Sequence, residues 1–162
     1  MQLRPLLSCV GSPLQDRSRA FGALILATGI PALVGAGLPG TDVTASITGL
    51  RSAKGQILAC MTARPDAFPG CTNDPAARRL VVPATTAAPL NFGQVPEGRY
   101  AIALIHDENG NGRLDKRLMI PREGFGFSKD APVMMGPPRF DSAAFPVGTQ
   151  TEHLTIRMRY LL

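Results

Sequence analysis

Hydrophobic and polar residues alternate in two segments of the chain, which is the pattern of a β-strand with one buried face. Residues 43–48 alternate in this way, and residues 154–160 place Leu, Ile, Met and Tyr at every second position. Residues 56–61 form a short apolar run, and the polar segment 49–55 before it predicts that the first two strands form a hairpin. Residues 99–106 are apolar at nearly every position, which predicts a central strand buried on both faces.

Weaker strand signals and Gly/Pro turns fill the rest of the pattern. Residues 80–82 and 90–92 are short strand candidates, and residues 140–147 predict a further strand before the last one. Residues 107–139 are expected to be mostly loop, and no segment keeps a helical period over about ten residues. Short strands at this spacing predict an all-β fold, a single antiparallel β-sandwich of the prealbumin or immunoglobulin type with about seven strands.

The N-terminus has the pattern of a targeting segment. Arg4, Arg17 and Arg19 precede an uncharged apolar run over residues 20–38, and Val34-Gly35-Ala36 offers small residues for a signal peptidase. This order predicts a signal peptide over residues 1–36 and a β-sandwich domain over residues 37–162, periplasmic or secreted. An uncleaved membrane anchor is the alternative, because the apolar run approaches the length that spans a bilayer.

Composition excludes several classes of protein. The chain has 162 residues, 44% of them hydrophobic and 18% charged, which excludes a disordered chain. The net charge of +5 is mild and scattered, there is no tryptophan, and aromatic residues are only 6%. A nucleic-acid partner is therefore not expected, since it needs a concentrated basic surface or stacking aromatics. A membrane is expected as a partner only through an uncleaved N-terminal segment.

Two cysteines remain after the signal segment, Cys60 and Cys71. In an oxidising compartment such an even pair predicts a disulfide. The bridge would close a loop of about a dozen residues and stabilise the fold by about 3 kcal/mol in the chain-entropy model. Two free thiols are the alternative, and a metal site is not expected because no further pair or suitably spaced histidine accompanies them.

The most specific motif follows the central strand. Asp107, Asn109 and Asn111 are spaced two apart, Gly112 follows, and Asp115 stands at the ninth position, which is the pattern of a calcium loop. Alternate side chains of such a loop turn toward one centre, and the Arg113 carbonyl would add a backbone oxygen. Calcium is the cofactor that this pattern predicts, with Kd on the order of 10⁻⁴ to 10⁻³ M.

Several features oppose calcium binding. The twelfth position, which carries a bidentate glutamate in helix–loop–helix sites, is Leu118, so Glu123 would have to fold back to supply the carboxylate. Lys116 and Arg117 place two positive charges near the proposed ion. A metal-free turn is therefore the alternative, since two Asn-Gly pairs after a strand are turn signals in their own right.

Catalytic and ligand-binding interpretations use neighbouring residues. A metal-assisted hydrolase centred on His106, Asp107 and Glu123 is the second function considered, but a lone histidine lacks the partners that such a site needs. His106 is better explained as the end of a strand that hydrogen-bonds a loop carbonyl. Phe125 and Phe127 alternate with glycines. Their burial in one end of the sandwich is favoured over a ligand surface together with His106, because aromatic side chains usually bury large areas.

These residues carry a resemblance to a known family. The run from Gly98 to Asp115, the segments 120–128 and 136–140, and the final alternating strand resemble domain of unknown function 2141, a group of bacterial exported proteins. The similarity covers most of the chain after the signal segment. Pro96-Glu97-Gly98-Arg99-Tyr100 is similar to a turn and strand of transthyretin-like and carboxypeptidase-regulatory-like sandwiches, which is an analogy of fold alone.

The resemblance implies a signal peptide, a compact periplasmic or secreted domain and no assigned activity. It offers no catalytic residue to transfer. The family often has an acidic or small polar residue and a glycine soon after the loop, where this chain has residues 116–119. The expected function is a non-enzymatic binding or structural module with a weak calcium loop over residues 107–115, and its expected partner is a glycan or a cell-envelope component.

Overall fold

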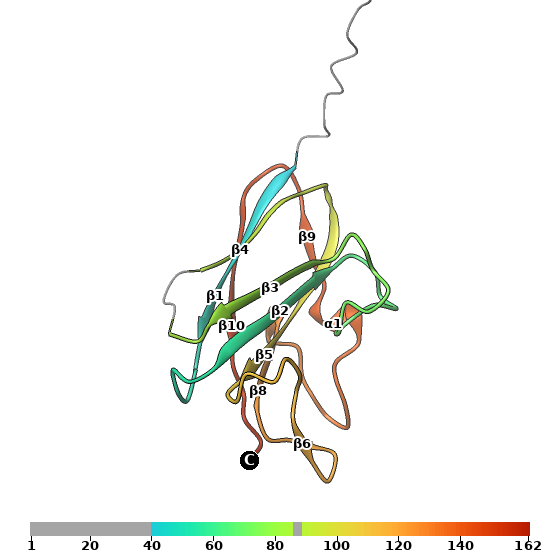
Figure 1. Cartoon of the computed structure of the whole chain (residues 1–162). Coiled ribbons are helices and arrows are strands. Elements are labelled where there is room, and N and C mark those ends of the chain that lie inside the picture. The colour runs from blue at the N-terminus through green and yellow to red at the C-terminus, as the bar shows by residue number, and fades with distance from the viewer. Residues whose placement is uncertain (1–39, 86–88) are drawn as a thin grey trace, which may run out of the picture. The chain divides into compact units, whose positions relative to one another are not determined.

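β-Strands dominate the part of the chain that the computed structural model describes, residues 40–85 and 89–162 (Figure 1). The strands are β1 (Thr41–Thr48), β2 (Gln56–Thr62), β3 (Arg78–Pro83), β4 (Leu90–Val95), β5 (Gly98–Asp107), β6 (Lys116–Arg117), β7 (Ile120–Pro121), β8 (Gly124–Phe127), β9 (Phe145–Val147) and β10 (Glu152–Arg157). A 3-10 turn, η1 (Ser128–Asp130), and a short helix, α1 (Phe140–Ala143), lie between β8 and β9.

Two sheets carry most of these strands. One has the order β10-β1-β4, and the other has the order β3-β2-β5-β8 with β9 paired to the start of β5. Every pair is antiparallel except β1 and β10, which run parallel. The all-β sandwich is thus confirmed, with one parallel pair that the sequence pattern did not predict. The connection after β9 reaches the first residues of β1, where the Thr41 hydroxyl donates to the Gly148 carbonyl. From there β10 runs beside β1 in the same direction, from Val43↔Glu152 to Thr48↔Arg157.

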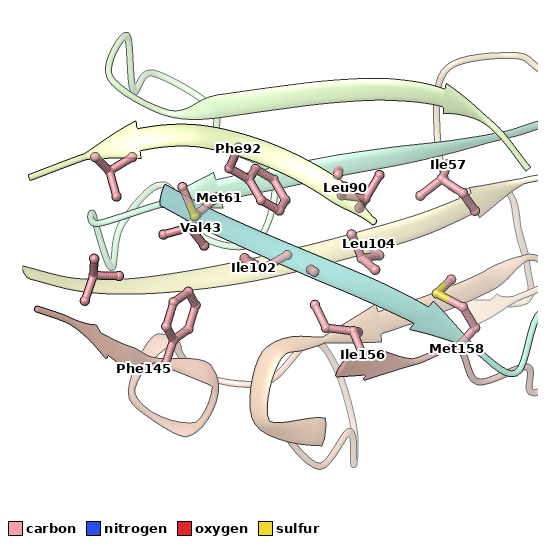
Figure 2. Close-up of a cluster of buried hydrophobic side chains, with 14 of the residues drawn as sticks. Val43, Ile57, Met61, Leu90, Phe92, Ile102, Leu104, Phe145, Ile156 and Met158 are labelled. Atoms are coloured by element: carbon pink, nitrogen blue, oxygen red, sulfur yellow. The ribbon is translucent and has the colours of Figure 1, made fainter. Parts of the chain in front are cut away.

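The main hydrophobic core lies between the two sheets. Val43 and Ala45 from β1 and Ile156 from β10 are fully buried against Ile102 and Leu104 of β5. Figure 2 shows these side chains pointing toward one another across the sandwich, with rings from β4 and β9 among them. Burial of such side chains contributes about 1.5–3 kcal/mol each, so this layer is the main source of stability.

The predicted hairpin of the first two strands is wrong. β1 pairs with β4 and β10, whereas β2 pairs with β3 and β5 in the other sheet. Both strands present alternate apolar side chains, and both turn those side chains into the same core from opposite sides. The segment 49–55 is therefore a crossing between sheets, which alternation alone cannot distinguish from a hairpin turn.

The central strand is confirmed, and it is buried on both faces. Ile102 and Leu104 face the main core, and Ala101 and Ala103 contact a second cluster. This second cluster also contains buried aromatic and small residues from β8 and the region around α1: Phe125, Phe127, Ala131, Phe140, Ala143 and Ala144.

The segments on either side of β8 are less regular than the strands. Residues 107–139 are mostly loop, as predicted, but they include β8, which pairs with β5 and completes the sheet. Residues 140–147, predicted as a strand, form α1 and then the shorter strand β9. The final strand alternates as predicted, and Ile156 and Met158 are its buried positions.

A disulfide joins Cys60 in β2 to Cys71, as their spacing predicts. A hydrogen bond beyond the disulfide also holds the segment between β2 and β3, because the Thr62 hydroxyl at the end of β2 donates to the buried Asp74 carboxylate at 2.5 Å. Asp74 also accepts the Ala76 amide at 3.0 Å. The excursion between β2 and β3 is therefore tied to the sheet at two places.

The signal peptide predicted for residues 1–36 lies outside the described residues. Within residues 40–85 and 89–162, no helix has the length and apolar character needed to cross a membrane. The sandwich prediction for residues 37–162 concerns the part of the chain that carries all the strands given above.

Gly126→Ala is expected to destabilise the fold by about 1–3 kcal/mol, because β8 lies too close to the end of β10 for any side chain. A Cβ at position 126 would lie 2.9 Å from Ile156 Cγ2 and 3.0 Å from the Arg157 carbonyl oxygen. Urea unfolding followed by circular dichroism measures the change. Gly136→Ala is the matched control, since a Cβ there meets nothing within 4 Å. Equal stability of the two variants would contradict this close packing.

Candidate functional site

The loop after β5 is built around one buried carboxylate. Asp107 is completely buried at the end of the strand. Its Oδ1 accepts the amides of Gly110 at 2.8 Å and Asn111 at 3.1 Å, and its Oδ2 accepts the Gly112 amide at 2.7 Å and the Gln56 side-chain amide at 2.8 Å. A carboxylate has about four lone-pair sites, so all of them are filled. Asp107 therefore closes the loop instead of facing a ligand in this structure.

Ionisation of Asp107 is favoured despite its burial. Burial acts to raise the pKa of Asp107, but the hydrogen bonds from Gln56, Gly112, Asn111 and Gly110 together outweigh it and hold that pKa below its usual value. A buried charge is tolerated here because every lone pair has a donor.

Two asparagines shape the loop by Asx turns, in which a side-chain oxygen accepts the backbone amide two residues further on. Asn109 Oδ1 accepts the Asn111 amide at 3.0 Å, and Asn111 Oδ1 accepts the Arg113 amide at 3.1 Å. Gly110 and Gly112 follow with φ of 73° and 79°, in the left-handed region that glycine adopts without strain. The alternation of Asx and Gly therefore coils the loop without any ion.

Asp115 closes the exposed side of the loop. Its Oδ2 accepts the Asn109 side-chain amide at 2.7 Å, and its Oδ1 accepts the Asn111 side-chain amide at 3.0 Å. These two bonds, with the Arg113 guanidinium 3.6 Å away, lower the pKa of Asp115. The structure thus brings Asn109, Asn111 and Asp115 together, as the calcium pattern predicts, with amide nitrogens turned toward the carboxylate.

Glu123 folds back to the loop, as the calcium interpretation requires. It is buried, with its Oε1 accepting the Glu108 amide at 3.1 Å and its Oε2 accepting the Asp115 amide at 2.9 Å. One carboxylate therefore bridges the beginning and the end of the loop. Each of its oxygens keeps one further lone pair.

Arg51 is a site residue that the motif did not reveal. Its guanidinium binds Glu108 at 2.5 Å, donates to the Arg122 carbonyl at 2.9 Å and lies 4.4 Å from the centre of the Tyr160 ring. It belongs to the crossing segment between β1 and β2, far from the loop in sequence. The basic character of that segment was visible in the sequence, but its partner was not.

Glu108 is consequently held as a carboxylate. The bond from Arg51, helped by the Ser52 hydroxyl at 2.8 Å, lowers the pKa of Glu108 to about 2 against the opposing effect of burial. Its side chain is 22% exposed, so solvent screens this pair only in part.

His106 is a structural residue and not part of a ligand surface. It is completely buried, with Nε2 2.8 Å from the Lys54 carbonyl oxygen and Nδ1 2.7 Å from the Tyr160 hydroxyl. A carbonyl only accepts, so Nε2 is the donor to Lys54, and Nδ1 shares a hydrogen bond with the Tyr160 hydroxyl. Both nitrogens are occupied, which agrees with the interpretation of His106 as a strand end that binds a loop carbonyl.

Phe125 and Phe127 do not form an exposed aromatic surface. They are 5% and 8% exposed and pack in the second cluster, with ring centroids 6.0 Å apart. Burial of aromatic rings is the usual outcome in a domain with few of them. The ligand surface proposed for His106, Phe125 and Phe127 is corrected to this extent.

The described residues contain no group of three or more His, Cys, Asp or Glu side chains arranged to hold a metal ion. Calcium differs from transition metals in that amide and carbonyl oxygens and water supply much of its coordination. The oxygen-bearing groups of the loop are therefore the ones to consider: Asn109, Asn111, Arg113 through its carbonyl, Asp115 and Glu123.

A family model described as an uncharacterized protein conserved in bacteria, DUF2141, matches residues 45–155, which is more than half of the chain. The chain belongs to the DUF2141 family. No curated protein and no solved structure was found to match it. The matched residues of the DUF2141 domain include the whole 107–115 loop together with Arg51 and Glu123. The likeness to transthyretin-like sandwiches stays a resemblance of residues 96–100.

Asp107→Asn is expected to destabilise the DUF2141 domain by about 2–4 kcal/mol, because one acceptor oxygen becomes a donor that faces the Gly112 and Gln56 N–H groups. Denaturant unfolding measures the loss. Asp42→Asn, on the exposed face of β1, is the matched control and should change stability by less than about 0.5 kcal/mol. A stable Asp107→Asn protein would show that the loop does not depend on this carboxylate.

Acid is expected to weaken the fold through Glu108. Because the pKa of Glu108 is lowered to about 2 from 4.5, its contribution is present above pH 4.5 and is lost as pH falls toward 2. Glu108→Gln should therefore remove part of the fall in unfolding free energy over that range, and Arg51→Gln should remove it too. An unchanged acid dependence in both variants would contradict this assignment. Urea titrations at several pH values make the comparison.

Proposed function

We propose that this DUF2141 domain is an exported, non-enzymatic binding module, periplasmic or secreted, whose 107–115 loop binds one calcium ion weakly. The observation that carries the proposal is the convergence of Asn109, Asn111 and Asp115 at the exposed side of the loop. Export is supported by the signal pattern of the N-terminal residues and by the Cys60–Cys71 disulfide, because such bonds persist in oxidising compartments.

The proposed ion has fewer ligand residues than the sequence pattern predicts. Asp107 has its lone pairs filled by four donors and so acts as the anchor of the loop. Asp115 supplies the carboxylate, and Asn109 and Asn111 supply amide oxygens once their side-chain amides turn over toward it. The Arg113 carbonyl, Glu123 and water complete the six to eight oxygens that calcium takes.

Weak affinity follows from the charges around this ligand set. Asp115 has the most exposed side chain of the three loop carboxylates, and the Arg113 guanidinium lies 3.6 Å from it. The ion must also replace the two amide hydrogen bonds to Asp115 and the two bonds that Asn109 Oδ1 and Asn111 Oδ1 accept from backbone amides. Few carboxylates and a nearby cation place Kd on the order of 10⁻⁴ to 10⁻³ M, the range of extracellular modules.

Calcium is expected to raise the melting temperature of the purified protein. At ten times Kd, mass action adds about 1.4 kcal/mol, which corresponds to a rise of roughly 3–8 °C. Thermal unfolding in 10 mM calcium is compared with unfolding in chelator, and magnesium serves as the ion control. Calorimetric titration of calcium gives Kd directly.

Asp115→Asn should abolish the calcium effect and leave the fold intact, since this side chain lies at the outer edge of the loop. Asp141→Asn is the matched control, because Asp141 is an exposed carboxylate paired with Arg99 in another part of the domain. A calcium response that persists in Asp115→Asn would contradict the ligand set. No response up to 10 mM would make the loop a metal-free turn.

A further inference from the structure

An apolar groove lies on the outer face of the β3-β2-β5-β8 sheet, opposite the main core. Its volume is about 660 Å³, within the roughly 300–1,000 Å³ range of small-molecule sites. Strand register places Val81, Leu58, Ile105 and Phe125 in one row across the four strands. All four side chains line the groove. The row spans about 14 Å, since neighbouring strands lie about 4.8 Å apart.

The walls of the groove are loops that carry exposed methionines. Met119, Met134 and Met135 line it and are 86%, 90% and 102% exposed. Val81 in the floor is 63% exposed. Exposed apolar side chains that gather around one groove mark a candidate binding surface, and flexible thioether side chains adapt to ligands of variable shape.

Charge in the groove has one sign. Arg79 and Lys116 line it, and no Asp or Glu side chain does. Arg79 stands beside Cys60 in the row next to the apolar one, and its guanidinium is held by the Cys71 carbonyl. Neither cation forms an ion pair with a side chain of residues 40–85 or 89–162. An anionic group is therefore the complement that this apolar groove lacks.

We propose that the groove binds a single-chain amphiphile with an anionic head, such as a long-chain carboxylate. The acyl chain lies along the row of Val81, Leu58, Ile105 and Phe125. The carboxylate faces Lys116, since the Arg79 guanidinium is already held by the Cys71 carbonyl. An extended chain of roughly ten to twelve carbons matches the length of the row, with bonds of about 1.5 Å. None of the proposed calcium ligands lines the groove, so this proposal does not rest on calcium binding.

The first test is calorimetric titration of the purified protein with decanoate and dodecanoate, below the concentrations at which they form micelles. Each buried methylene is worth about 0.8 kcal/mol, so dodecanoate, with two more methylenes than decanoate, should bind about fifteenfold more tightly. Dodecyltrimethylammonium, with the same chain and a cationic head, should bind at least fivefold more weakly than dodecanoate. Equal binding of the two heads, or no binding of either, overturns the proposal.

Variants locate the site without threatening the fold. Lys116→Gln should weaken dodecanoate binding about two- to fivefold, as expected of a partly exposed charge pair. Arg117→Gln is the matched control, because Arg117 is the neighbouring cation of β6 and does not line the groove. Val81→Glu, at an exposed edge position, should weaken binding at least tenfold with an unchanged melting temperature. Binding that survives Val81→Glu overturns the placement.

A second copy of the chain is the competing occupant. Analytical ultracentrifugation without amphiphile decides between them, since the proposal expects a monomer in which the groove is open. A dimer that Val81→Glu dissociates, and that dodecanoate does not, would show that the groove is an interface and would overturn the proposal.

Discussion

Both faces of β5 must be covered, and most of the structure follows from that constraint. An apolar strand buried on one face only would leave a row of hydrophobic side chains in water. The β10-β1-β4 sheet covers the face that carries Ile102 and Leu104, and β8 with the region around α1 covers Ala101 and Ala103. The covering of the second face is incomplete beyond Ala103, and the apolar groove begins there with Ile105.

The same strand delivers two polar side chains into the interior at its end. His106 and Asp107 are both completely buried, and a buried polar group without partners costs free energy comparable to a lost hydrogen bond or more. Partners come from four places: the loop itself, the crossing segment before β2, Gln56 at the start of β2, and Tyr160 near the C-terminus. These demands fix the loop more firmly than its exposed, Gly-rich sequence suggests. At Gly55 the backbone of the crossing segment comes so close to Asp107 that a Cβ there would overlap its carbonyl oxygen.

The local features could be predicted from the sequence, and the long-range pairings could not. The periodicity of the sequence identified β1, β2, β5 and β10 as strands, because side-chain alternation is a property of each strand alone. It could not assign β1 and β2 to different sheets, since a crossing and a hairpin turn use the same small polar residues. The Asx–Gly loop was recognised from its spacing, and Glu123 was correctly expected to return to it. The pairing of Arg51 with Glu108 could not be predicted, because 57 residues separate them and no local sequence pattern indicates the contact. Burial of Phe125 and Phe127 was the favoured expectation, but α1, whose Phe140 and Ala143 pack in the same cluster, is too short to give a periodic signal.

Gly112 and Leu114 belong to the 107–115 loop and also line the groove. The loop and the groove therefore share part of one wall. Linkage makes any coupling between them reciprocal: the factor by which an ion in the loop changes the affinity of the groove for its occupant is also the factor by which that occupant changes the affinity of the loop for the ion.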